Sequence, residues 1–164
     1  MKIGRSLLAT TLLAVVVAAT VVAVAAAAPS AARQRVAIDG KVSSPESGTF
    51  TFVPLTSAAL KKDSGKVISA GNNQPPPGVV RSNGQTVWTF GNTASYTGAN
   101  GTLKVLERLA LVAAGRNYNV VTGTWKVISG TGAYEGFRGG GTVAAVQSPS
   151  GTVFFHEEGY LTKP

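Results

Sequence analysis

Two glutamates stand in apolar stretches of this chain, where a carboxylate can act as an acid or a base. If residues 102–114 form a strand, Glu107 shares one face with apolar side chains only: Leu103, Val105, Leu109 and Leu111. Glu157 has a similar place near the end of the chain, on a face with Val153, Phe155 and Leu161. Burial raises the pKa of a carboxylic acid unless a partner compensates, and perturbed carboxylates concentrate at functional sites. The alternatives are an outward-facing Glu107 paired with a surface lysine, or a structural ion pair.

Arg138 is the third candidate, because it could neutralise either of these glutamates. A guanidinium cannot lose its proton, so an arginine inside a protein must find an acceptor. If Arg138 lies in the interior, we therefore expect it within salt-bridge reach of Glu107 or Glu157. Such a pair would either serve a ligand or brace the fold.

His156 is the one histidine of the chain, and there is no cysteine. This composition makes a zinc site improbable and excludes thiolate metal sites, disulfides and a cysteine nucleophile. A catalytic triad would need Asp39 or Asp63, and both stand in turn-like sequences. Alternation places His156 on one face with Phe154, Glu158 and Tyr160, and we expect it to be exposed. No metal and no cofactor are predicted.

The elements that must position these residues are strands. Glycine, threonine and valine are frequent, and helical periodicity is nearly absent, which indicates an all-β domain with tight turns. Residues 55–78 are the least regular part, with one helical turn conceivable at 56–62 and an extended loop at 72–78. The segment 102–114 could also form a helix ending at Gly115, but its hairpin-type flanks favour a strand. The predicted strands are 36–42, 50–53, one starting at 87–90, 102–114, 118–129, 142–147 and 153–161.

Seven or eight strands joined by short turns suit a meander closed into a barrel, which leaves no exposed sheet edges. In a barrel of this size Trp88 and Trp125 belong either to the core or to the wall of a ligand pocket. We keep both as pocket candidates.

The most distinctive stretch is 123–139, in which a strand runs into a glycine turn, an aromatic residue and a second glycine turn. Glycines here supply positive-φ positions or room for a neighbouring backbone. The residues of this turn motif are Gly130, Gly132, Tyr134, Gly136 and Gly139.

This stretch resembles the barrel shared by the dirigent and allene oxide cyclase families. In those families a strand ends in Gly-Gly-Thr-Gly or a variant, followed by an aromatic residue and later by Arg-Gly. The resemblance implies a closed, antiparallel, eight-stranded barrel from about Val36 onward, with a hydrophobic pocket and often a trimeric assembly. It also implies that Arg138 lines the pocket, although Ala133 stands where the dirigent pattern has an aspartate.

The first 28 residues have the pattern of a secretory signal. Lys2 and Arg5 precede an uncharged run of Leu, Val, Ala and Thr that ends in small residues. We predict a signal helix at 1–28 with cleavage in the region 25–32, a linker at 29–35 and one domain at 36–164. An uncleaved membrane anchor is the alternative, because about 20 apolar residues suffice to span a bilayer.

The formal net charge of +8 comes from bases scattered along the chain, without a basic run interleaved with aromatics. A solvated surface is therefore favoured over a face that binds polyanions, and no nucleic-acid partner is predicted. The function expected first is a secreted barrel that binds a small apolar or aromatic molecule. The alternatives are an isomerase, cyclase or dirigent-like enzyme using a buried Glu/Arg pair, and a structural envelope or matrix protein with a filled barrel.

Overall fold

The computed structural model describes residues 33–43, 46–56, 59–71, 78–81 and 83–164. The predicted signal helix at 1–28 and residues 72–77 of the loop predicted at 72–78 lie outside these residues. Residues Ala31–Pro164 form one compact unit. Its first strand begins at Gln34, slightly before the predicted domain start at Val36. No helix among the described residues is long and apolar enough to cross a membrane.

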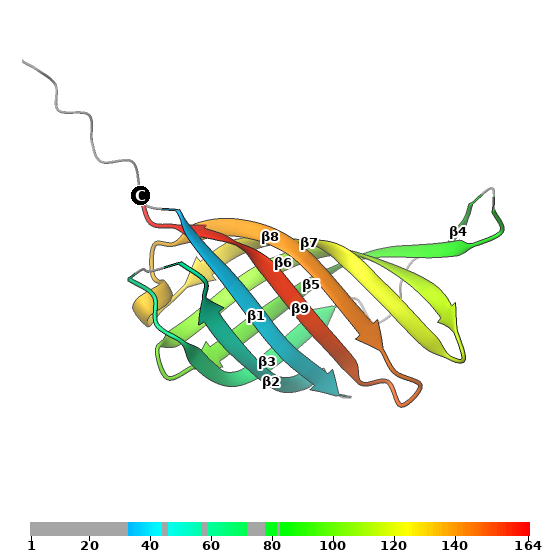
Figure 1. The fold of residues 1–164 in the computed structure, drawn as a ribbon, viewed down its shortest axis with the longest axis horizontal. Coiled ribbons are helices and arrows are strands. Elements are labelled where there is room, and N and C mark those ends of the chain that lie inside the picture. Colours follow the sequence, from blue (N-terminus) through cyan, green and yellow to red (C-terminus); the bar gives the residue numbers. More distant parts are fainter. Residues whose placement is uncertain (1–32, 44–45, 57–58, 72–77, 82) are drawn as a thin grey trace, which may run out of the picture. The chain divides into compact units, whose positions relative to one another are not determined.

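The described chain forms a closed antiparallel barrel, which confirms the all-β prediction (Figure 1). The sheet order is β3-β2-β1-β9-β8-β7-β6-β5, and pairing of β3 with β5 closes an eight-stranded ring. The short β4 pairs with the first residues of β5, outside this ring. The strands are β1 (Gln34–Ser43), β2 (Ser47–Pro54), β3 (Asp63–Gly71), β4 (Val79–Val80), β5 (Thr86–Gly98), β6 (Gly101–Gly115), β7 (Tyr118–Gly130), β8 (Arg138–Gln147) and β9 (Val153–Thr162).

The segment predicted at 102–114 is strand β6, so the helical alternative is wrong. Residues from Leu103 to Arg108 alternate between buried and exposed, as expected for a strand with one face on the core. Pairing with both β5 and β7 satisfies the backbone on its two sides. The same parity turns Glu107 inward.

The sequence analysis missed β3, which lies in the stretch read as irregular. Its sequence is poor in apolar residues, and Val67 is its one buried hydrophobic side chain. The segment forms a strand because it pairs with β2 on one side and with β5 on the other. These tertiary contacts outweigh its weak intrinsic preference for a strand. The described residues of the predicted helical turn at 56–62 are not helical.

One end of the barrel is packed shut, and we call it the closed end; it contains Phe52, Leu60, Asp63, Tyr134 and Phe137, all buried. Tyr134 belongs to a 3-10 turn, Gly132–Tyr134, between β7 and β8. Its ring meets that of Phe52 edge-on, with centroids 5.4 Å apart. Its hydroxyl donates to Asp63 Oδ2 at 2.9 Å.

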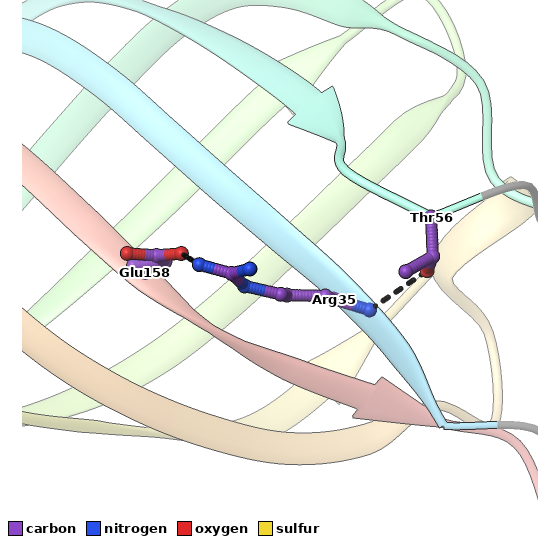
Figure 2. A network of polar contacts seen from close by, with 3 residues as sticks. All are labelled: Arg35, Thr56 and Glu158. Atoms are coloured by element: carbon purple, nitrogen blue, oxygen red, sulfur yellow. Dashed lines mark hydrogen bonds and ion pairs between the residues drawn. The ribbon is translucent and has the colours of Figure 1, made fainter.

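Polar pairs on the outer surface join the first and last strands, which are neighbours in the ring (Figure 1). Figure 2 shows Arg35 of β1 donating to Glu158 of β9, while its backbone N–H donates to Thr56 Oγ1 at 3.0 Å. His156 Nδ1 lies 2.7 Å from Asp39 Oδ1 on the same face. His156 is exposed, as predicted from the alternation of β9.

Candidate functional site

The other end of the barrel contains a cavity of about 550 Å³, and we call it the cavity end. Its lining extends to two connections between strands. Val42 and Glu46 lie where β1 leads into β2, and Gln147 and Gly151 lie where β8 leads into β9. Most of its wall is apolar, and includes Val67, Phe90, Leu109, Val121, Val143 and Phe155. A concave, mostly apolar space with a few convergent polar groups is typical of a small-molecule site.

Glu107 is the main charged group inside this cavity. It is only 5% exposed, and its carboxylate Oε2 accepts a hydrogen bond from Asn92 Nδ2. Asn92 lies opposite Glu107 on β5 and also donates to Ser69 Oγ of β3 at 2.8 Å. Three strands therefore contribute to one polar cluster on the cavity wall. The prediction that Glu107 faces the interior is correct.

Glu157 is fully buried and is not part of the cavity wall. Tyr96 lines the cavity, and its hydroxyl donates to Glu157 Oε1 at 2.7 Å. Burial raises the pKa of the Glu157 carboxyl well above its usual range, and the hydrogen bond and charge of Glu107 act in the same direction. The hydrogen bond from Tyr96 opposes this shift.

The two glutamates come together across the barrel from β6 and β9, which are not neighbouring strands. Neighbouring carboxyl groups do not both ionise readily, and this repulsion is one cause of the raised pKa of the Glu157 carboxyl. Glu157 Oε2 has no donor among the described residues. Protonation of this carboxyl group would turn Oε2 into a donor toward the neighbouring Glu107. Burial also raises the pKa of Tyr96, with the charges of both glutamates adding to the effect.

Arg138 does not join these residues, so the predicted ion pair with Glu107 or Glu157 is wrong. Its side chain is exposed at the start of β8, on the same outward parity as Thr142 and Ala144. It is absent from the cavity wall, and the ion pairs found among the described residues are those of Arg35 and His156. Strand alternation decides this outcome, because the inward residues of β8 are Val143 and Ala145.

Neither tryptophan lines the cavity. Trp125 is buried in the core, where its ring lies over Gly159; a Cβ at Gly159 would come within 2.7 Å of the indole. Trp88 is half-buried on β5. In the described structure Trp125 therefore belongs to the core, which is one of the two roles predicted for it.

The glycine turn motif lies at the closed end of the barrel and positions Tyr134 there. Gly132 and Gly136 have φ values of +60° and +76°, which glycine adopts without strain. A side chain at Gly130 would collide with the backbone of Tyr134. This turn delivers Tyr134 to the core, while Gly139 lies in β8.

Three polar residues with important contacts were not predicted, namely Ser69, Asn92 and Tyr96, and the structural role of Asp63 was not predicted either. Asn92 and Tyr96 could have been found, because they share the parity of Phe90 in β5. Asp63 and Ser69 could not, since their strand was not recognised. No group of three or more metal-ligating side chains occurs in the described part of the chain.

Comparisons with protein-family models, curated proteins and solved structures found no match to this chain. The resemblance to the allene oxide cyclase and dirigent families thus stays a prediction, and the barrel itself is what the structure establishes.

Proposed function

We propose that the barrel binds a small, largely apolar or aromatic molecule in the cavity end. The observation that carries this proposal is the cavity of about 550 Å³, whose apolar wall surrounds one polar cluster at Glu107 and Asn92. Small eight-stranded barrels can be filled by their own side chains, and this one keeps a space of ligand size. That space argues against a purely structural barrel.

A pair of variants on β8 tests the binding proposal. Ala145 faces the cavity and Ala144, its neighbour, faces solvent. We expect Ala145→Phe to fill the cavity and to weaken binding of the neutral fluorescent probe N-phenyl-1-naphthylamine at least about tenfold. Ala144→Phe is the matched control and should bind the probe like the unmodified protein. Equal binding by both variants, with both folded, would contradict the proposal.

The predicted signal at 1–28 supports a function outside the cytoplasm, which is also part of this proposal. We expect a mature N-terminus between Ala26 and Arg33. Intact-mass measurement of protein from the culture medium tests this expectation. Full-length protein found only in the membrane fraction would favour the uncleaved anchor. Mass spectrometry of the same sample under native conditions would identify a co-purifying ligand and the oligomeric state.

A second candidate function is acid–base catalysis of an isomerisation or cyclisation. The observation that favours it is the convergence of Glu107, Glu157 and Tyr96 at an apolar cavity. Glu107 would act as the base, and the protonated Glu157 would hold the pair's proton. If Glu107→Gln keeps ligand affinity but stops conversion of a co-purifying ligand, the barrel is an enzyme. A ligand recovered chemically unchanged after long incubation favours a binding protein.

A further inference from the structure

We propose that the ligand of this cavity carries a protonated amine, which is held by Glu107 and lies close to Asn92. This inference rests on the proposed binding function and specifies the chemical class of the ligand. Its basis is the balance of donors, acceptors and charges in the cavity wall.

Three donors next to the cavity, the two N–H groups of Asn92 and the Tyr96 hydroxyl, already have acceptors within the protein, and the hydroxyl hydrogen of Ser69 is the remaining one. Both N–H groups of Asn92 are engaged, one with Ser69 Oγ and the other with Glu107 Oε2. The Tyr96 hydroxyl donates to Glu157. By contrast, Asn92 is more than nine-tenths buried, and its Oδ1 has no hydrogen-bond partner among the described residues. Asn92 Oδ1 and the carboxylate of Glu107 are both acceptors, so a ligand group that donates hydrogen bonds complements them better than one that only accepts.

The charges point the same way. Glu107 and Glu46 belong to the cavity wall, and no lysine, arginine or histidine occurs among the described lining residues. Every lysine and arginine between Arg33 and Lys163 is exposed. The barrel thus carries a basic outer surface around an acidic cavity. A buried carboxylate without a cation is costly, and a cationic ligand group would compensate Glu107.

Aromatic side chains next to the cluster add to this preference. Phe90, Tyr96 and Phe155 line the cavity, and the rings of Tyr96 and Phe155 lie 6.1 Å apart. The face of an aromatic ring attracts an ammonium group, most strongly where water is excluded. An alcohol could donate one hydrogen bond but would leave the charge of Glu107 uncompensated. A carboxylate ligand would be repelled.

Three compounds that differ only in their polar group test this inference. We would titrate the purified protein at neutral pH with 4-phenylbutylamine, 4-phenylbutan-1-ol and 4-phenylbutanoate, using calorimetry. The amine should bind at least about tenfold more tightly than the alcohol, because hydrogen bonds to charged groups are the strong ones. The carboxylate should bind most weakly.

Two variants locate the effect. Glu107→Gln keeps an acceptor for Asn92 and should reduce the preference for the amine over the alcohol to less than about threefold. Glu135→Gln removes an exposed glutamate and should leave the preference unchanged. If the alcohol or the carboxylate binds as tightly as the amine, the inference is wrong and the proposed binding function stands. If none of the three compounds binds, and the neutral probe does not bind either, both are wrong.

Discussion

The buried carboxyl groups at the two ends of the barrel differ in the number of hydrogen bonds that they accept. At the closed end, Asp63 accepts hydrogen bonds from the backbone N–H groups of Ser64, Ala99 and Asn100 and from the Tyr134 hydroxyl. At the cavity end, Glu107 accepts one hydrogen bond among the described residues, from Asn92. Among the described residues, four donors reach the carboxylate of Asp63 and one reaches the carboxylate of Glu107.

This difference separates Asp63, whose carboxylate joins several turns and strands, from Glu107, whose carboxylate lines the cavity. Asp63 ties the start of β3 to the β5–β6 turn and to the turn that holds Tyr134. Glu107 lies in the apolar wall of the cavity, and Glu157 is fully buried with its Oε2 unpartnered among the described residues. Perturbed carboxyl groups concentrate at functional sites.

The largest effect is expected for Asp63→Ala. The change leaves three backbone donors and the Tyr134 hydroxyl without their acceptor, so the free energy of unfolding should fall by at least about 3 kcal/mol. Urea denaturation measures this loss. A drop below about 1 kcal/mol would show that Asp63 does not hold the closed end together.

A smaller loss is expected for Tyr134→Phe. The ring keeps its contact with Phe52, while the hydrogen bond to Asp63 is lost. The free energy of unfolding should fall by about 1–2 kcal/mol. Tyr118→Phe, at an exposed tyrosine, is the control and should not change the denaturation curve. Equal effects of the two variants would contradict the role assigned to Tyr134.

At the cavity end, Glu157→Gln should change how stability depends on pH. Because the folded protein raises the pKa of Glu157, its protonated form is favoured by folding. The associated stability is present at low pH and is lost as pH rises above the unfolded value of about 4.3 toward the folded pKa. The variant lacks this loss, so it should become more stable than the unmodified protein by about 1 kcal/mol at neutral pH.

Thermal or urea unfolding between pH 4 and pH 8 measures that difference. Glu135→Gln serves as control, since Glu135 is exposed. Parallel pH curves for the unmodified protein and Glu157→Gln would refute the assignment of a proton to this carboxyl group.

The smallest effect is expected on the outer surface, away from both ends. Asp39→Ala removes the hydrogen bond to His156, and both side chains are more than half exposed. Exposed pairs contribute little, so the free energy of unfolding should change by less than about 0.5 kcal/mol. A larger loss, measured by the same urea titration, would mean that this pair contributes to barrel closure.

Much of the fold could be predicted from alternation in the sequence. The apolar periodicity of 102–114 and 153–161 identified β6 and β9 and turned Glu107 and Glu157 inward, because a strand's side chains alternate strictly between two faces. The same rule, applied to β8, would have turned Arg138 outward. The resemblance to a family motif outweighed it there, and the predicted ion pair was wrong.

The candidate site could be predicted only in part, because its polar residues come from distant strands. Asn92 shares the inward parity of Phe90, so its orientation could be predicted, but nothing local sets Ser69 apart. Ser69 lies in β3, a strand whose pairing partners compensate for its weak apolar pattern. Their meeting depends on the register of β3 against β5, which no single strand specifies.

The sequence by itself determined the strand class, the inward faces and the two interior carboxyl groups, since these depend on a local period of two residues. Only the tertiary structure decided which interior groups meet, because closing the sheet brings β6 and β9 together across the barrel and sets their heights along its axis. It also decided that, among the described residues, four donors reach the carboxylate of Asp63 and one reaches that of Glu107. That outcome depends on which turn or strand lies opposite each carboxylate, and only the closed barrel sets those neighbours.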